Sequence, residues 1–439
     1  MTAPTSGPAA GPLRIALAGL GTVGAGTVAL LRDNVEPIAR RAGRRLEIVA
    51  VAARDRQRRR GVELDGIAWY DDAVAMAAAP DIDVVVELIG GSDGIARRVV
   101  ETAIASGKHV VTANKALLAH HGTALARQAE ARGVSLGFEA SVAGGIPILK
   151  VLREGLAANR IDRLYGILNG TCNYILTSMR DAGRDFADVL AEAQRLGYAE
   201  ADPAFDIDGI DTAHKLALLA AVAFGGAVAL DGIHVEGIRH VSAQDIAFAA
   251  ELGYTIKLLG VARPTEQGLE RRVHPCMVPN AAPIAHVEGV FNAVVVEGDA
   301  VGRLMLEGRG AGAAPTASAV VADLIDIAAG RGAPGFGVPA AALHETRTAP
   351  MAIHRGAYYM RLMVQDRPGV IADIAAALRD EQVSMEQMLQ RGRAAAGEGV
   401  PVVITTHVTE EAAMLRAVDR IAKLDTVREP PRLIRIEAL

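Results

Sequence analysis

The glycine pattern near the start of the chain is the feature that most constrains the fold. Residues 14–18 form a short apolar run, Gly19, Gly21 and Gly24 follow at once, and an alanine-rich stretch continues to residue 32. This order predicts a strand, a tight turn and a helix. In dinucleotide-binding folds the first glycine makes that turn, the second lets the backbone approach a pyrophosphate, and the third allows close helix–strand packing. We expect a Rossmann-type parallel sheet, although a tight turn without a ligand is the alternative.

The residues that follow the next strands suggest the cofactor. The predicted strand 46–52 runs towards Arg54 and Asp55. An acidic residue there binds the ribose hydroxyls of NAD, whereas an arginine can pair with the 2′-phosphate of NADP. Arg54 favours NADP, and the adjacent Asp55 keeps NAD open. The expected nucleotide-binding residues of this region are Gly19, Gly21, Thr22, Val23, Gly24, Arg54, Gly90, Gly91 and Ser92.

Length, charge and cysteine content exclude several classes of protein. The 439 residues suffice for two or three domains, and the net charge of −5 gives no electrostatic case for nucleic-acid binding. The basic cluster 54–60 is interpreted as a solvated loop. Two cysteines cannot build a disulfide framework, which favours a reducing, cytoplasmic location. Residues 1–12 are expected to be a disordered tail, not a signal peptide, and the uncharged, apolar run 216–230 is too short to span a bilayer.

An acidic segment, residues 197–215, carries five acidic residues and one lysine between apolar helical stretches. Asp202-Pro203 disfavours helix and Gly209 permits a tight turn, so we expect a folded loop before a helix that resumes near Asp211. Asp211 and Lys215 are then one helical turn apart on the same face. An ordinary helix ion pair is the simplest interpretation.

The order of residues in this segment supports a functional interpretation instead. From Ala193 to Lys215 it follows A-x-x-x-G-Y-A-x-x-D-P-x-x-D-I-x-G-x-D-x-x-x-K, which resembles the signature of homoserine dehydrogenases. The resemblance implies reversible NAD(P)-dependent reduction of L-aspartate 4-semialdehyde to L-homoserine. We expect three catalytic residues, which are Lys215 as the proton donor, Lys115, which faces the reacting centre from a matching T-A-N-K segment, and Asp211. Further expected roles are substrate binding by Glu200, Asp206 and Asp211, and cofactor contacts by Lys115, Gly197 and Glu200.

Two other segments resemble the same family. Residues 169–174 match its N-G-T-x-N-Y segment, which implies that Thr171 and Asn173 line the substrate pocket. Cys172 invites a rival hypothesis, a thioester-forming nucleophile, but a simply buried thiol is the more common case. Residues 138–147 match a segment that binds a monovalent cation, expected to be sodium. The implied cation-binding residues are Glu139, Val142, Gly144 and Ile146.

The glycine-rich stretch 308–318 precedes an apolar helix that suits packing back on the nucleotide-binding domain. Its family counterpart closes over the cofactor, which implies a contact from Gly312. The first domain is therefore expected to be discontinuous in sequence, with residues 13–146 joined by residues 311–330.

The C-terminal region predicts the element order β-α-β-β-α-β, which resembles the ACT module. Residues 366–370 match its ligand loop, and Asp366 is expected to cap the following helix. The resemblance implies that threonine binds at Asp366, Pro368, Gly369 and Val370 and inhibits the enzyme. A dimerisation module that binds nothing is the alternative.

Together these features predict an α/β protein with a Rossmann-type parallel sheet domain, an α+β catalytic and dimerisation domain with an open, mostly antiparallel sheet, and a ferredoxin-like ACT domain. The expected boundaries are 1–12 for the tail, 13–146 plus 311–330 for nucleotide binding, 147–310 for catalysis and dimerisation, 331–355 for a linker and 356–439 for regulation. We expect a homodimer or homotetramer with no membrane partner. The alternative function is an amino-acid-sensing regulatory protein whose dehydrogenase half is degenerate.

Overall fold

The structure is a computed structural model that describes residues 11–391 and 399–439. The expected tail lies outside the described residues except for positions 11 and 12. The described chain forms two compact units, each assembled from separate stretches of sequence. The first comprises residues up to 170, 211–231 and 291–346, and the second comprises 171–210, 232–290 and 347–439. None of the described helices is both long enough and apolar enough to cross a lipid bilayer.

The first unit contains a six-stranded parallel sheet with the order β3-β2-β1-β4-β5-β6. This is the strand order of doubly wound dinucleotide-binding folds, so the predicted Rossmann-type sheet is confirmed. Its central strands consist almost wholly of apolar residues because helices cover both faces. The strands are β1 (Leu13–Ala18), β2 (Leu46–Ala52), β3 (Ala68–Tyr70), β4 (Val84–Glu87), β5 (His109–Thr112) and β6 (Leu136–Gly137).

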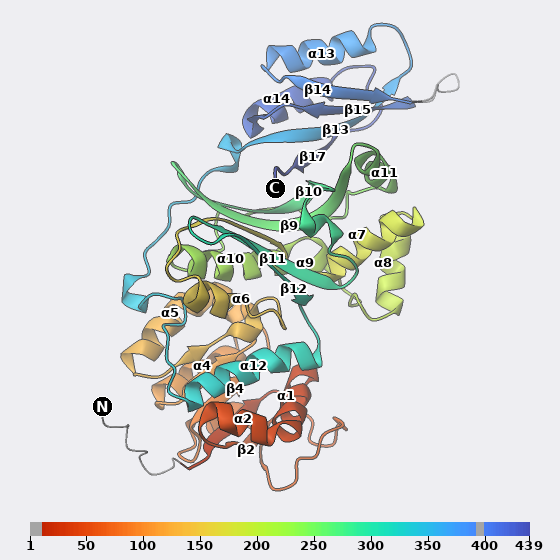
Figure 1. The fold of residues 1–439 in the computed structure, drawn as a ribbon. Helices are drawn as coiled ribbons and strands as arrows, with labels where there is room; N and C mark the ends of the chain where they lie inside the picture. The colour runs from red at the N-terminus through yellow and green to blue at the C-terminus, as the bar shows by residue number, and fades with distance from the viewer. Residues whose placement is uncertain (1–10, 392–398) are drawn as a thin grey trace. The chain divides into compact units, whose positions relative to one another are not determined.

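Helices from two distant parts of the sequence complete this layer. Helix α12 (Ala313–Ala328) packs against α1 (Thr22–Asp33), as Figure 1 shows. Val320, Val321 and Leu324 of α12 belong to the same buried cluster as the β1 side chains. The predicted return of this helix to the nucleotide-binding sheet is thus confirmed. The remaining helices around the sheet are α2 (Val35–Ala42), α3 (Ala73–Ala78), α4 (Ile95–Ala105) and α5 (Lys115–Ala131).

The other strands of the first unit are β7 (Ile161–Ile167), β11 (Phe291–Gly298) and β12 (Gly302–Arg309), which pair antiparallel in the order β12-β11-β7. Helix α10 (Ile210–Phe224) begins at the end of the acidic segment, as predicted, and ends before Gly225, whose φ is +67°. Almost the whole of α10 is buried, including its two charged residues. Short helices α6 (Ile148–Lys150) and η2 (Val151–Gly155) follow the nucleotide-binding sheet.

The second unit contains residues 197–210 of the acidic segment and a long hairpin of β9 (Tyr254–Thr265) and β10 (Gly268–Pro279). Strand β8 (His234–Val235) pairs with β10, and the capping box of Ser242 and Asp245 starts α11 (Ala243–Glu251). The other helices here are α7 (Gly170–Ala182), α8 (Phe186–Arg195) and α9 (Ala204–Ile207).

The C-terminal part of the second unit has the β-α-β-β-α-β order of an ACT module, with the sheet order β17-β13-β15-β14. Apolar faces of both helices pack on one face of this sheet. The predicted ferredoxin-like fold is confirmed. Its elements are β13 (Arg355–Gln365), α13 (Val370–Asp380), β14 (Met385–Gln390), β15 (Gly399–Thr406), β16 (Thr409–Glu410), α14 (Glu411–Ile421) and β17 (Arg432–Ile436).

Candidate active site

Asp211 is the centre of a buried charge cluster in the first unit. Lys215 donates to Asp211 Oδ2 at 2.7 Å and to the Leu168 carbonyl oxygen at 2.6 Å. Lys115 Nζ lies 3.0 Å from Asp211 Oδ1, and the Asn169 amide donates to Oδ2 at 2.8 Å. Asp211 and Lys215 lie one turn apart on α10, Lys115 is the first residue of α5 beyond β5, and Asn169 follows β7. The fold therefore brings together all three predicted catalytic residues.

The electrostatics of this cluster favour an ionised carboxylate. Burial alone would raise the pKa of Asp211, but the charges of Lys215 and Lys115 and the hydrogen bonds from Lys215 and Asn169 hold it well below its ordinary value. Asp211 and Lys215 expose only 3% and 8% of their surface, so the pair is shielded from water. One carboxylate faces two lysine side chains, so the cluster has more positive than negative groups. The excess positive charge is available to a carbonyl oxygen of a substrate.

A cavity of about 790 Å³ lies at the glycine turn of the first unit. Gly19 has φ +110°, and a Cβ atom there would lie 2.6 Å from the Leu88 carbonyl oxygen. A Cβ on Gly24 would collide with the Gly19 carbonyl oxygen, whereas one on Gly21 would meet nothing within 4 Å. Gly19 and Gly21 line the cavity, so the open space beside Gly21 fits the close approach of a pyrophosphate.

The rim of this cavity is rich in arginine. Arg54, Arg58 and Arg60 line it, and residues 54–59 are exposed, as expected of a solvated loop. The Asp55 carboxylate is engaged by its own loop, since Oδ1 accepts the backbone N–H groups of Gln57 at 2.8 Å and Arg58 at 3.2 Å. Arg54 and Asp55 both line the cavity, so a side chain for a 2′-phosphate and one for ribose hydroxyls are both present there.

Other expected cofactor residues surround the sheet of the first unit. Gly90 and Gly91 have φ of +87° and +86°, and Gly90 lines the cavity. The Ser92 hydroxyl donates to Asp93 at 3.0 Å. Gly312 precedes α12 with φ +116°. Thr22 and Val23 form the first turn of α1, so the N-terminus of that helix follows the cavity-lining Gly21.

The expected substrate residues other than Asp211 belong to the second unit. Glu200 is exposed, and Asp206 lies on the single-turn helix α9 and not on irregular loop as predicted. The Thr171 hydroxyl donates to the Tyr198 carbonyl oxygen at 2.9 Å. The Asn173 amide donates to the Val287 carbonyl oxygen at 3.1 Å and accepts from Lys257 at 3.1 Å. Both ends of the Asn173 amide thus contact groups of the protein.

Gly197, the remaining expected cofactor residue, also belongs to the second unit. It follows α8 with φ +78°, a backbone conformation that glycine adopts without strain. Its N–H donates to the Gln194 carbonyl oxygen at 3.1 Å, so it ends the helix that leads into the acidic segment.

Cys172 is fully buried, and its thiol donates to the Asp206 carbonyl oxygen at 3.2 Å. A reactive cysteine needs an electropositive, partly exposed site that stabilises the thiolate. The geometry of Cys172 therefore favours the structural interpretation over the thioester-forming nucleophile.

The expected cation segment follows β6 as a tight, buried bend. Ala143 and Gly144 have φ of +54° and +48°, and a Cβ on Gly144 would lie 2.5 Å from the Gly310 carbonyl oxygen. The Glu139 carboxylate accepts backbone N–H groups of Leu149 at 3.0 Å and Lys150 at 2.9 Å. Burial, followed by the nearby charge of Asp323, raises the pKa of Glu139 to about 7. Val142 and Ile146 are buried in the same bend.

The ACT ligand loop borders a cavity of about 270 Å³, lined among others by Asp366, Pro368 and Val370. Gly369 is the N-cap of α13 with φ +95°, and no side chain caps this helix. The prediction that Asp366 caps it was wrong, and the Asp366 side chain is exposed beside the cavity. The N-terminal N–H groups of α13 are thus not blocked by that carboxylate.

Sequence reasoning missed several residues of these sites. Asn169 stood inside the quoted N-G-T-x-N-Y segment, so its motif could have identified it. The Leu168 carbonyl oxygen has no sequence signal, because any residue supplies a carbonyl. No motif pointed to His120 and His121, which lie on α5, where the His120 ring packs edge-on against His214 at 5.5 Å.

Three family models match the chain. They are homoserine dehydrogenase at residues 147–325, homoserine dehydrogenase NAD-binding domain at 19–139 and ACT domain at 358–425. Homoserine dehydrogenases of Neisseria gonorrhoeae and Pseudomonas aeruginosa are 48% and 46% identical, each alignment covering 98% of this chain and 99% of the relative.

Solved structures agree with these matches. A homoserine dehydrogenase from Thiobacillus denitrificans has a TM-score of 0.91 at 49% identity, covering 97% of this chain and 98% of that one. A hyperthermophilic archaeal homoserine dehydrogenase in complex with NADPH has a TM-score of 0.62 at 25% identity, covering 72% of this chain and 97% of that one.

Proposed function

The chain belongs to the homoserine dehydrogenase family of NAD(P)-dependent oxidoreductases and carries a C-terminal ACT domain, and from this premise we propose how its residues perform the reaction. The observation that carries the proposal is the buried Asp211 carboxylate held between Lys215 and Lys115. In the reducing direction Lys215 gives a proton to the carbonyl oxygen of L-aspartate 4-semialdehyde. In the oxidising direction the same nitrogen takes the proton from the L-homoserine hydroxyl.

The other charged residues of the site are proposed to bind the substrate and to orient Lys215. Asp211 fixes the Lys215 ammonium through a 2.7 Å hydrogen bond, and Lys115 adds a second positive charge at the same carboxylate. Glu200 and Asp206 are proposed to pair with the substrate ammonium group, and Thr171 to hold a polar group of the substrate. The nicotinamide, when bound, exchanges a hydride with the substrate carbon.

We propose NADP as the preferred cofactor. The glycine turn fits a dinucleotide, because Gly21 leaves open space and the rim of the cavity supplies Arg54, Arg58 and Arg60. An arginine can pair with a 2′-phosphate in two hydrogen bonds, whereas Oδ1 of the Asp55 carboxylate already accepts two backbone N–H groups of its own loop. The archaeal relative whose structure was solved with NADPH supports the same choice.

A monovalent cation, sodium, is proposed to bind the bend at residues 139–146. Neutral carbonyl oxygens of Val142, Gly144 and Ile146 with the Glu139 carboxylate make a hard donor set that suits such an ion. Both oxygens of that carboxylate already accept backbone N–H groups, so the carbonyl oxygens would supply most ligands. Replacing sodium chloride by choline chloride at equal ionic strength should lower Tm for the wild type and not for Glu139→Gln. Equal melting of the wild type in both salts would refute the ion site.

The domain boundaries expected from the sequence are proposed as the functional division of the chain. Residues 13–146 with 311–330 bind the nucleotide, 147–310 form the catalytic and dimerisation part, 331–355 link, and 356–439 bind an effector. A homodimer or homotetramer is proposed. Among the described residues, β12 is an edge strand of its sheet. An edge strand of this kind can pair with a strand of another chain. Light scattering of the purified protein tests this, and a monomer at all concentrations would refute it.

The central experiment is a spectrophotometric assay with L-homoserine and either NADP or NAD. We expect absorbance of the reduced cofactor to appear only when both compounds are present, with a lower KM for NADP. The alternative, an amino-acid sensor with a degenerate dehydrogenase half, predicts no turnover. The complete cluster of Lys115, Asp211 and Lys215 argues against it.

A further inference from the structure

The ACT module continues the sheet of the β9–β10 hairpin within the second unit. Strand β17 pairs parallel with β10, with Cys276 opposite Arg435 and Met277 opposite Ile436. The Glu437 N–H donates to the Met277 carbonyl oxygen at 3.0 Å, which extends the pairing by one residue. The module is thus joined to β10 by backbone hydrogen bonds, so a displacement of β17 acts directly on the hairpin.

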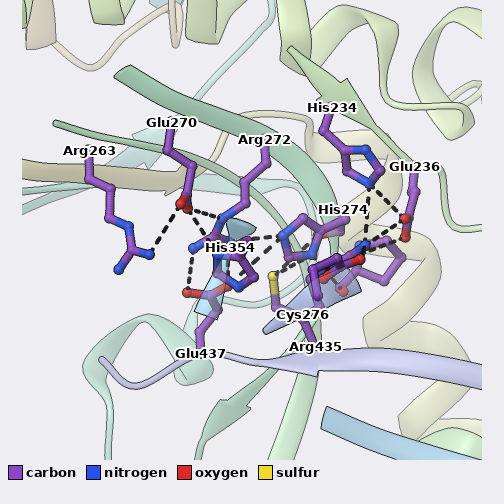
Figure 2. Close-up of polar contacts among 12 residues, drawn as sticks. His234, Glu236, Arg263, Glu270, Arg272, His274, Cys276, His354, Arg435 and Glu437 are labelled. Atoms are coloured by element: carbon purple, nitrogen blue, oxygen red, sulfur yellow. Dashed lines mark hydrogen bonds and ion pairs between the residues drawn. The ribbon is translucent and has the colours of Figure 1, made fainter. Parts of the chain in front are cut away.

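Arg435 is a buried member of the network of charged side chains at this junction (Figure 2). Its Nη1 lies 2.9 Å from Glu236 Oε2 and its Nη2 lies 3.0 Å from Oε1, so the two side chains form a bidentate pair. The same guanidinium donates to Glu411 of the ACT module at 3.0 Å, and the Tyr358 hydroxyl also donates to Glu411, at 2.6 Å. Arg435 therefore links an ACT carboxylate to a carboxylate outside the module.

Glu236 remains ionised in this setting. Burial would raise its pKa, but hydrogen bonds from His234 and Arg435 lower it to about 2. The pair is therefore charged at neutral pH. Replacing Arg435 removes both of its hydrogen bonds to the Glu236 carboxylate, whose side chain is 41% exposed, so the substitution loosens the position of Glu236.

Glu236 begins a segment, residues 236–239, that lies directly on the acidic segment. The Ile238 N–H donates to the Ile207 carbonyl oxygen at 2.8 Å, and a Cβ on Gly237 would collide with that oxygen. Arg239 pairs with Asp208, with Nη2 2.9 Å from Oδ2. Ile207 and Asp208 directly follow Asp206, so residues 236–239 set the position of a proposed substrate-binding carboxylate.

A metal site is a weaker interpretation of the same junction. His274, Cys276 and Glu437 offer ligand atoms within 4.8 Å of one another. However, His274 Nε2 lies 2.9 Å from Arg272 Nη1, and Glu437 forms an ion pair with Arg272 at 3.1 Å. The Cys276 thiol donates to the His274 carbonyl oxygen at 3.3 Å. A divalent cation would sit against a buried guanidinium, so this cluster is a structural network.

We propose that Arg435 is a positioning residue that couples the ACT module to the substrate site through Glu236, residues 236–239 and Asp206. An amino acid bound to the module would shift β17, and the Arg435–Glu236 pair would pass that shift to the acidic segment. The inference deepens the proposed function, because it rests on substrate binding by Asp206 and on effector binding by the module. Under this proposal, Arg435 controls the affinity for homoserine and not the affinity for the cofactor.

The test compares Arg435→Met with a matched control, Arg361→Met. Arg361 is also a buried ACT arginine, but it pairs with Asp245 of α11, at 3.3 Å for Nη2. We expect Arg435→Met to raise the KM for L-homoserine about five-fold or more and to weaken inhibition by L-threonine by a similar factor. The KM for NADP should stay unchanged, and Arg361→Met should leave both homoserine KM and threonine inhibition near wild type.

A second variant keeps the inference testable if Arg435→Met does not fold. Glu236→Gln preserves the size of the side chain and should raise the KM for L-homoserine in the same direction. Its effect should not add to that of Arg435→Met in the double variant, because the two residues act as one pair. Unchanged homoserine KM in folded Arg435→Met or Glu236→Gln, or an equal rise in Arg361→Met, would overturn the inference. Threonine insensitivity of the wild type would remove only the proposed effector, since the homoserine KM tests Arg435 without it.

Discussion

At the scale of single residues, the site depends on Asp211 as much as on the lysine it holds. Its carboxylate is the shared partner of Lys115, Lys215 and Asn169; Lys215 and Asn169 are buried with it, whereas the Lys115 side chain is 34% exposed. Its depressed pKa is a measure of how strongly the folded protein prefers the ionised form. Asp211, which the sequence pattern predicts as a functional residue of the acidic segment, is therefore the electrostatic centre of the cluster.

Asp211→Asn should destabilise the protein at pH 7 by about 3–5 kcal/mol, because two lysines then lose their buried counter-charge. The folded-state pKa of Asp211 is lowered, so its contribution to stability is complete above its ordinary value of 3.8 and is lost as the pH falls below it. The free energies of unfolding of the wild type and the variant, measured in urea, should therefore converge as the pH falls below 3.8. A difference that stays constant with pH would contradict this assignment.

Arg54→Ala should raise the KM for NADP about ten-fold, which corresponds to about 1.4 kcal/mol, and should change the KM for NAD much less. The reason is that only NADP carries the 2′-phosphate that the guanidinium would meet. Arg59→Ala is the control, because Arg59 is exposed on the same loop and does not line the cavity. Equal effects of Arg54→Ala on both cofactors would show that Arg54 points elsewhere.

At the scale of elements, two glycines of the G-x-G-x-x-G pattern between β1 and α1 have different roles, one in packing and one in ligand approach. Gly24 is required by the packing of the helix against the strand, since a Cβ there would collide with the Gly19 carbonyl oxygen. Gly21 has φ −78°, which any residue adopts, and open space around it. A glycine is required at position 21 only if a ligand approaches the backbone there.

Gly21→Ala should therefore keep the wild-type Tm and raise the KM for NADP, because the added methyl group would occupy space beside the pyrophosphate. Gly24→Ala should lower the stability by about 1–3 kcal/mol, since the new atom meets backbone that cannot move freely. Thermal melting and cofactor titration of both variants check this. A loss of stability in Gly21→Ala, with normal cofactor binding, would refute the separation of roles.

How far the sequence predicts these elements depends on whether the signal is local. The strand–turn–helix of residues 13–33 and the ACT element order were predicted because apolar runs and glycines mark them within a few positions. The single turn of α9 was missed because Asp202-Pro203 argues against helix before residue 203 and says nothing of the residues after it. The absent cap of α13 was missed because Asp366 has a capping side chain but stands three residues before Gly369, the actual N-cap.

At the scale of the whole molecule, the regulatory proposal concerns the ACT module and its attachment. The module is not a loosely tethered appendage, because β17 pairs with β10 and Arg272, which is 1% exposed, forms an ion pair with Glu437. Deleting the module would strip Arg272 of that partner and leave residues 276–277 of β10 without their paired strand. Point substitutions in the ligand loop are thus a cleaner test of regulation than truncation. Such long-range contacts are beyond sequence patterns, since residues 272 and 437 are remote in the chain.

L-Threonine should inhibit homoserine oxidation by the wild type, and Asp366→Ala should raise the threonine concentration for half inhibition about five-fold or more without changing uninhibited turnover. The physical reason is that the exposed Asp366 carboxylate borders the cavity beside α13 and makes no capping contact that folding requires. Asp380, also exposed in part but paired with Arg379 and Arg420 away from that cavity, offers the control Asp380→Ala. Identical threonine sensitivity of Asp366→Ala and wild type would contradict the site.

The most direct measurement for the account as a whole is the turnover of Lys215→Ala with L-homoserine and NADP, alongside its affinity for NADP. The variant should lose turnover by about 100-fold or more, the scale of a lost proton-transfer group, while its Kd for NADP stays near the wild-type value. Lys423→Ala, an exposed lysine of the ACT module, should behave like the wild type in both measurements. Wild-type turnover in folded Lys215→Ala would mean that the proton comes from another group, and the catalytic assignment would be wrong.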